Sequence, residues 1–200
     1  MTKDREAAAR ALRAQQELLG TCTDCSLCEG RTQVVFGVGS PVADLLFIGE
    51  GPGFNEDKLG EPFVGQAGKL LTELLAGIGL AREDVYIANV VKCRPPGNRD
   101  PLPVEIEACS PKLMEQIRIL RPRVVCTLGR FATRLIAQTD APITSIRGRA
   151  KAAEVAGVPV RAFREWSPVA KYDVVIYNSG LAANHLDAVR KASGLGARLL

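Results

Sequence analysis

Short apolar runs alternate with segments of helical spacing along this chain, and no other feature of the sequence constrains its fold as strongly. Apolar runs of strand length occupy residues 44–48, 85–91 and 124–128. Helical spacing of apolar residues appears between them, at 66–79 and 103–120. Parallel strands need crossover connections, which are usually helices, so this alternation predicts a parallel sheet covered by helices on both faces.

The rest of the chain continues this alternation. A helix is expected at 130–138, strands at 158–163 and 174–177, and a closing helix at 181–192. A length of 200 residues suits one compact domain. We therefore expect residues 1–200 to form a single three-layer α/β domain, with a central, mostly parallel four-stranded sheet flanked by helices.

The composition is that of an ordinary globular protein, with 46% hydrophobic and 24% charged residues. No apolar run approaches the roughly 20 residues that span a bilayer, and residues 1–13 lack the apolar centre of a secretory signal and instead predict an exposed amphipathic helix. Six cysteines without such a signal favour metal or redox use in a reducing compartment over a disulfide framework. We expect a cytoplasmic protein without a membrane partner.

Basic residues gather in segments that flank the expected strands. The formal net charge is +4, and one arginine group comprises Arg118, Arg121, Arg123, Arg130 and Arg134. A modest basic excess is common on globular domains, so this group fits either a solvated face or contact with phosphate.

Ligands of parallel α/β sheets bind beyond the carboxyl ends of the strands. Three segments of unusual composition are expected there: the Gly-Glu-Gly-Pro-Gly turn at 49–53, residues 89–96, and Gly129. The glycines and the proline of the first turn, Gly49, Gly51, Pro52 and Gly53, would let backbone N–H groups approach a base or a phosphate. The turn also fits a nucleotide-binding loop, but no Gly-Lys-Ser/Thr follows it.

Four cysteines in distant loops suggest a metal centre. Cys22 and Cys25 form a C-x2-C pair, in which one tight turn supplies two thiolates, and Cys93 and Cys109 lie much further along the chain. From spacing alone an iron–sulfur cluster and a tetrahedral zinc site fit equally well. Cys28 extends the pair to C-x2-C-x2-C, so spacing also leaves open which cysteines bind.

Several motifs, in order and with matching spacing, resemble the iron–sulfur uracil-DNA glycosylases known as family 4. They are the opening from Cys-Thr-Asp-Cys at 22–25 to Glu-Gly-Arg at 29–31, Gly-Glu-Gly-Pro-Gly-Phe-Asn-Glu-Asp at 49–57, Gly-Glu-Pro-Phe-Val-Gly at 60–65, and Tyr-Ile-Ala-Asn-Val-Val-Lys-Cys-Arg-Pro-Pro at 86–96. The resemblance covers about residues 22–149. It implies a uracil-DNA glycosylase-like fold and hydrolysis of the N-glycosidic bond of uracil in DNA.

The resemblance also implies a cofactor. Cys22, Cys25, Cys93 and Cys109 occupy the ligand positions of the family's [4Fe-4S] cluster, and Cys28 does not. In the family this cluster is regarded as structural and orders loops near the DNA face.

Cleavage of an N-glycosidic bond develops positive charge on the sugar and negative charge on the departing uracil. Glu50 occupies the position of the family's first-motif acid, where it would orient a water and stabilise the sugar cation. The alternative for Glu50 is a cap on the turn that follows.

Two residues are expected to bind the base. The amide of Asn89 can donate and accept along the edge of uracil and reject the reversed pattern of cytosine, although Asn also fits a local turn. Phe63 matches the aromatic residue on which the extruded base stacks; a lone Phe would otherwise be core.

The resemblance fails after about Arg149. The family's His-Pro motif, whose histidine stabilises the uracil anion, has no counterpart here. An ungapped reading puts Ser167 in its place and makes it the candidate catalytic donor, whereas an alignment anchored on Tyr177 and Asn178 puts Lys171 there. The single histidine, His185, is a minor candidate as a substitute.

The expected partner is uracil-containing DNA, single- or double-stranded, bound by a monomer. Because the histidine is missing, two rival functions stay open: a protein that binds uracil or abasic DNA with little or no turnover, and a glycosylase for another deaminated base.

Overall fold

The computed structural model describes residues 4–142, together with 145, 155–156 and 177–178. The strand expected at 158–163 and the helix expected at 181–192 lie outside the described residues. So do Ser167, Lys171 and His185.

The centre of the fold is a five-stranded sheet with the strand order β1-β3-β2-β4-β5. Neighbouring strands β3, β2, β4 and β5 are all parallel, which confirms the four-stranded parallel sheet expected from the sequence. Strand β1 adds an antiparallel edge that the sequence did not predict, because two residues are too few for a recognisable pattern. The strands are β1 (Val38–Gly39), β2 (Leu45–Gly49), β3 (Tyr86–Asn89), β4 (Val124–Thr127) and β5 (Tyr177–Asn178).

Helices connect the strands at the expected places. The segments predicted at 66–79, 103–120 and 130–138 are helical, and each begins at the expected residue and ends within two residues of the expected end. The six-residue helix α3 was not predicted, because it is too short to show a period. The helices are α1 (Arg5–Gly20), α2 (Leu27–Gly30), α3 (Phe54–Leu59), α4 (Gln66–Gly77), α5 (Pro103–Leu120) and α6 (Arg130–Ala137), with a 3-10 turn at Pro96–Asn98.

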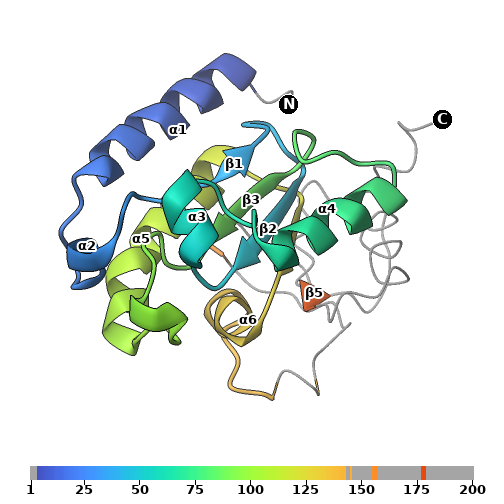
Figure 1. Cartoon of the computed structure of the whole chain (residues 1–200). Coiled ribbons are helices and arrows are strands. Elements are labelled where there is room, and N and C mark those ends of the chain that lie inside the picture. The colour runs from blue at the N-terminus through green and yellow to red at the C-terminus, as the bar shows by residue number, and fades with distance from the viewer. Residues whose placement is uncertain (1–3, 143–144, 146–154, 157–176, 179–200) are drawn as a thin grey trace.

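Successive side chains of β2 point to opposite faces of the sheet and divide the core in two. Phe47 packs in a cluster with Leu71 and Leu75 of α4, whereas Leu46 packs in a second cluster with Leu113 of α5. Figure 1 shows α4 on one side of the sheet and α5 on the other. The three-layer arrangement predicted from the alternation of elements is therefore confirmed.

Helix α1 positions the segment that follows it. It runs further than the expected 1–13, buries Leu12 and Leu19, and contacts α5. The Gln15 side chain on α1 donates a hydrogen bond of 2.7 Å to the Lys112 carbonyl of α5. The chain therefore leaves α1 close to the helix that carries Cys109. Across the part of the chain that the structure describes, no helix has both the length and the apolarity needed to cross a membrane.

Candidate functional site

The Gly-rich turn lies at the carboxyl end of β2, directly beside the end of β3. Gly49 pairs with Asn89 in the parallel register. Two further backbone hydrogen bonds continue the pairing, from Val90 N–H to the Gly49 carbonyl at 2.9 Å and from Val91 N–H to the Glu50 carbonyl at 3.1 Å. The two loops expected to share a rim are therefore held together by backbone contacts.

Three residues predicted to form the base site meet at this rim. A Cβ atom added to Gly49 would lie 2.5 Å from both the Phe63 Cζ and the Asn89 Oδ1 atoms. The absence of a side chain at Gly49 therefore lets the Phe63 ring and the Asn89 amide lie against the same stretch of backbone.

Asn89 carries an unusual polar atom. Its side chain is only 2% exposed, and its Oδ1 atom has no hydrogen-bond partner among the described residues. A buried acceptor without a partner costs about 1–3 kcal/mol, so such atoms are rare in native proteins and need an explanation. A ligand that brings an N–H donor to this atom would remove the penalty.

Glu50 follows Gly49 and is half-buried. Burial raises the pKa of its carboxyl group, the negative charge of Asp100 raises it further, and the positive charge of Arg130 partly offsets both. Asp100 and Arg130 themselves form an ion pair between the loop before α5 and the start of α6. Glu50 thus combines a perturbed pKa with a position next to the base site, as is common for catalytic acids and bases.

The remaining residues of the turn have well-defined surroundings. A Cβ atom on Gly51 would lie 2.6 Å from Val91 Cγ2, so a side chain there would collide with the Val91 side chain, two residues after β3 ends. Pro52 is buried. The backbone N–H of Gly53 donates a hydrogen bond of 3.2 Å to Glu56 Oε2 on α3.

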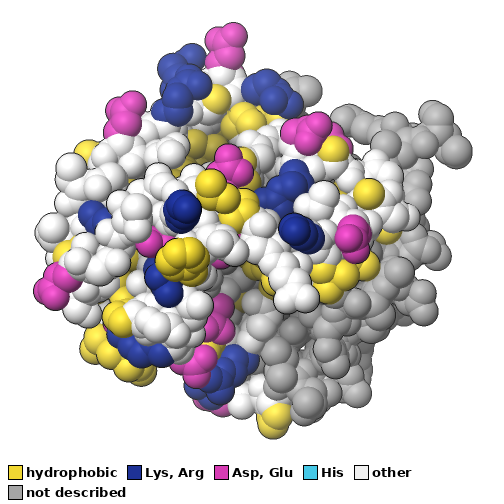
Figure 2. All heavy atoms as spheres, in the orientation of Figure 1, with side chains coloured by type: hydrophobic (Ala, Val, Ile, Leu, Met, Phe, Trp, Pro, Cys, Tyr) yellow, Lys and Arg dark blue, Asp and Glu magenta, His cyan; other side chains and the backbone are white. Residues whose placement is uncertain are grey.

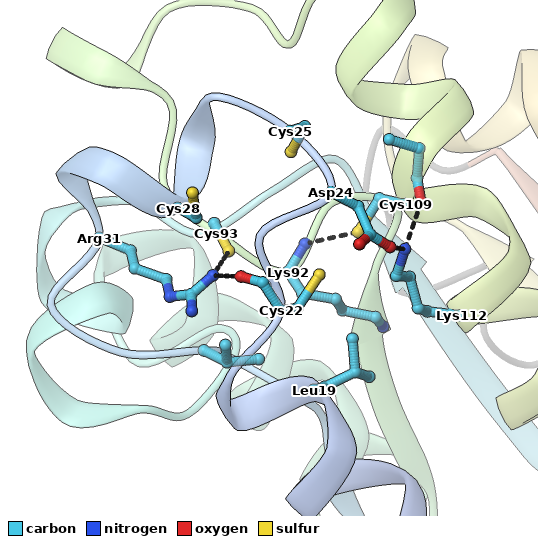
Figure 3. A pocket seen from close by; sticks show the side chains of 12 residues that line it. Leu19, Cys22, Asp24, Cys25, Cys28, Arg31, Lys92, Cys93, Cys109 and Lys112 are labelled. Atoms are coloured by element: carbon cyan, nitrogen blue, oxygen red, sulfur yellow. Dashed lines mark hydrogen bonds and ion pairs between the residues drawn. The ribbon is translucent and has the colours of Figure 1, made fainter.

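The cysteines expected to bind a cluster line one pocket. Figure 3 shows Cys22 and Cys25 from the segment after α1, Cys93 from the loop after β3, and Cys109 from α5 around it. Cys28 of α2 lines the same pocket, so proximity does not single out four ligands. All five are free thiols.

Cationic groups and N–H donors surround these sulfur atoms. The Arg31 guanidinium donates to the Cys22 carbonyl at 2.7 Å and lies 3.5 Å from Cys93 Sγ. The backbone N–H of Lys92 donates to Cys109 Sγ at 3.3 Å. Burial raises the pKa of the Cys93 thiol to about 11, and Arg31 partly offsets this shift. Such donors and cations suit a group that carries negative charge on its sulfur ligands.

The donor set fits an iron–sulfur cluster. Cluster irons take thiolate ligands, and the pocket brings five thiols from three separate segments together. Among the described residues no three Cys, His, Asp or Glu side chains converge closely enough to hold a single metal ion. Thiolates also bind zinc in tetrahedral structural sites, so the donor set by itself fits either group.

Most arginines of the basic group noted in the sequence are ion-paired. Arg118 pairs with Glu115, Arg130 with Asp100, and Arg134 with Asp140. Figure 2 shows basic and acidic side chains interspersed over the face drawn there. These observations favour a solvated face for this group. Beside the Gly-rich turn, Phe54 is 57% exposed and the Arg94 guanidinium lies 5.1 Å from its ring centre.

Comparison with known proteins places the chain in a family. The family model described as the uracil DNA glycosylase superfamily matches residues 36–188. A type-4 uracil-DNA glycosylase of Archaeoglobus fulgidus is 45% identical over 88% of this chain and 88% of its own length. One of Sulfurisphaera tokodaii is 45% identical over 80% and 74%, and one of Thermotoga maritima is 51% identical over 66% and 69%. The chain belongs to the type-4 uracil-DNA glycosylase family.

The match to the glycosylase superfamily extends beyond Arg149, where the motif-by-motif resemblance ends. The candidate replacements for the family's histidine, Ser167 first among them, lie outside the described residues. Their assignment stays a prediction.

Sequence reasoning missed several residues that surround the type-4 glycosylase motifs here. Arg31 lies within the quoted motifs but received no role, and Arg130 was named only as a member of the basic group. Asp100 and Arg82 gave no signal, because their contacts depend on the tertiary fold. Glu56 did give one: a Glu three residues after the residue that precedes a helix, here Gly53 before α3, is typical of a capping box.

Proposed function

We propose that this chain, acting as a monomer, hydrolyses the N-glycosidic bond between uracil and deoxyribose in DNA and leaves an abasic site. The observation that carries the proposal is the buried Oδ1 atom of Asn89, which lies beside the Phe63 ring and has no partner within the described structure. The N3–H of uracil is a donor of the kind that this acceptor needs. Family membership independently supports the same reaction.

The base would be read before the bond is broken. Uracil, flipped out of the stack at a cost of a few kcal/mol, would stack on the Phe63 ring and present its N3–H to Asn89 Oδ1. The Asn89 amide nitrogen would donate to the O4 carbonyl of uracil. Cytosine carries an acceptor at N3 and a donor at the exocyclic amine. Its N3 would face the Asn89 Oδ1 acceptor and its amine would face the Asn89 amide N–H donors, so neither hydrogen bond could form.

Glu50 is the candidate for the chemical step. As the N1–C1′ bond breaks, its electron pair leaves with uracil and positive charge develops on the sugar. The Glu50 carboxylate would stabilise that charge and orient a water whose oxygen bonds to C1′, and it would accept the proton that the water releases. The backbone N–H of Gly51 would face the base or a neighbouring phosphate, whereas the N–H of Gly53 already donates to Glu56 Oε2. Ser167 is proposed as the weaker neutral donor in place of the family's histidine.

We further propose that Cys22, Cys25, Cys93 and Cys109 hold a [4Fe-4S] cluster. Five free thiols that line one pocket, with Arg31 and the Lys92 backbone N–H directed at the sulfurs, support a cluster at this place. The choice of these four cysteines over Cys28 rests on the ligand positions of the family. When bound, the cluster would supply a structural cross-link among three chain segments that are distant in sequence. Its place next to the loop that follows Asn89 would stabilise the base site without taking part in bond cleavage.

The proposal is tested by uracil release from single-stranded and G·U duplex oligonucleotides, with purified, cluster-loaded wild-type protein beside Glu50→Ala. Release by the wild type that is lost in Glu50→Ala is the expected result. Glu115→Ala serves as a matched control, because it removes an exposed carboxylate of α5 that pairs with Arg118. Binding of uracil-containing DNA without release by the wild type would contradict turnover and favour a recognition protein.

A further inference from the structure

The backbone of Phe63 has a conformation that side chains rarely adopt. Its φ angle is +55°, in the left-handed region that glycine favours. Residues in such conformations persist only where the surrounding structure holds them, and they cluster at functional sites. The contacts around Phe63 therefore show what keeps this aromatic ring in place.

One peptide unit next to Phe63 is held at both ends by opposite charges. The carbonyl of Phe63 accepts a hydrogen bond of 3.1 Å from Arg82 Nη1. The N–H of the same peptide unit, which belongs to Val64, donates to Glu56 Oε1 at 2.9 Å. A cation at the oxygen end and an anion at the N–H end match the dipole of the peptide, so this plane cannot rotate without losing charge-assisted bonds on both sides.

The same two side chains hold the neighbouring peptides. Arg82 Nη2 donates to the Pro62 carbonyl at 2.8 Å, so the planar guanidinium spans two consecutive carbonyls. Glu56 Oε1 also accepts from Gly65 N–H at 2.8 Å, and its Oε2 accepts from Gly53 N–H at 3.2 Å. Glu56 thus joins the turn that carries Phe63 to the Gly-rich turn that carries Glu50.

Helix α4 leaves room for this arrangement. A Cβ atom on Gly68 would lie 1.8 Å from the Phe63 carbonyl oxygen, so the backbone of the Phe63 turn rests directly on the helix. On the other side the Phe63 ring and the Asn89 Oδ1 atom both lie 2.5 Å from the point where a Cβ atom on Gly49 would sit. A rotation of the peptide after Phe63 would therefore move the ring away from Asn89.

We infer that Arg82 and Glu56 are positioning residues that clamp the Phe63 turn and thereby set the ring against which the extruded base stacks. This inference rests on the proposed function. Neither residue needs to touch the base, and both act through the backbone of residues 62–65. The clamp makes affinity for uracil depend on a guanidinium that lies outside the recognised motifs.

The first test is Arg82→Lys, which keeps the positive charge but lacks the planar fork that spans two carbonyls. Because stacking on Phe63 contributes to binding in both the ground and transition states, KM for uracil-containing DNA and the inhibition constant of free uracil should both rise about tenfold, with kcat changed much less. Arg118→Lys on α5, which makes the same exchange at an exposed ion pair, should change neither. A fall in kcat at unchanged KM would overturn the inference.

A double-mutant cycle distinguishes the clamp from a general loss of stability. In a Phe63→Ala background the ring is gone, so adding Arg82→Lys should change KM by less than about twofold. If Arg82→Lys still raised KM about tenfold without the ring, Arg82 would act by another route and the inference would be wrong. Glu56→Gln, which turns one acceptor into a donor against Val64, Gly65 or Gly53, should behave like Arg82→Lys.

Amide hydrogen exchange tests the clamp independently of activity. Exchange at Val64 and Gly65, whose N–H groups donate to Glu56, should be faster in Arg82→Lys and in Glu56→Gln than in the wild type. Unchanged exchange in both variants would contradict the clamp. If the wild type released no uracil, the proposed function would fail, and this exchange measurement would still decide whether the clamp exists.

Discussion

Replacing Asn89 with aspartate changes one atom of the base site while keeping its shape. Asn89 is buried, and nothing in the described structure pairs with its Oδ1 atom. In Asn89→Asp the acceptor that would meet the uracil N3–H stays in place. The amide nitrogen proposed to face the uracil O4 carbonyl becomes an oxygen, so two acceptors then oppose each other without water.

The size of the effect follows from this burial. Loss of one hydrogen bond together with an unsatisfied pair of buried acceptors costs about 3 kcal/mol, which corresponds to roughly a 100-fold lower kcat/KM for uracil. Burial should also raise the pKa of the introduced carboxyl group. Its protonated form offers one O–H donor and one acceptor, as the amide does, so the ratio of variant to wild-type activity should rise as the pH falls.

The assay is single-turnover release of uracil, and of cytosine, from otherwise identical single-stranded oligonucleotides, repeated between about pH 8 and about pH 6. Asn98→Asp is the matched control, because Asn98 is exposed and its Oδ1 accepts from Arg94 Nε at 2.7 Å, a contact that aspartate keeps. Asn98→Asp should leave release unchanged. Retention of near-wild-type uracil release by Asn89→Asp across this range would refute the base-reading role.

As the pH falls, uracil release should be lost at a higher pH than an unperturbed glutamate would give, since burial raises the pKa of Glu50 and only its carboxylate is active. Asp100→Asn removes a charge that raises this pKa, so it should shift the pH–rate profile to lower pH, and an unshifted profile would argue against that contact. Iron analysis and visible absorbance spectra should show that Cys93→Ser loses the bound iron and the absorbance, whereas Cys28→Ser keeps both. Equal loss in the two variants would refute the ligand assignment. Gly49→Ala should stop uracil release at unchanged iron content, because its Cβ would lie 2.5 Å from the Phe63 ring and the Asn89 amide; wild-type release would place the base elsewhere.

The parallel sheet could be predicted from the sequence because its central strands are buried on both faces. Residues Leu45 to Ile48 of β2 are all buried, so the strand forms a continuous apolar run, and the helices that follow carry periodic apolar residues. Strand β1 and helix α3 have too few residues for any period to appear. Their formation depends on contacts with β3 and with the Phe63 turn.

The candidate site was predictable where it lies at strand ends. The position of Asn89 at the end of β3 and of Glu50 after β2 follows from topology, since carboxyl ends of parallel strands meet at one edge. Asp100 and Arg82 could not be found in this way. Each reaches the site through a loop whose path is decided by tertiary packing, and neither belongs to a pattern with a characteristic spacing.

The role of Asn89 in reading uracil is tested most directly by a crystal structure of the protein with free uracil bound, in which the distance from uracil N3 to Asn89 Oδ1 is measured. We predict that the ring stacks on Phe63 and that this distance is about 2.7–3.2 Å, a normal hydrogen bond. Uracil bound away from Phe63, or with no contact to Asn89 Oδ1, would contradict the proposed site.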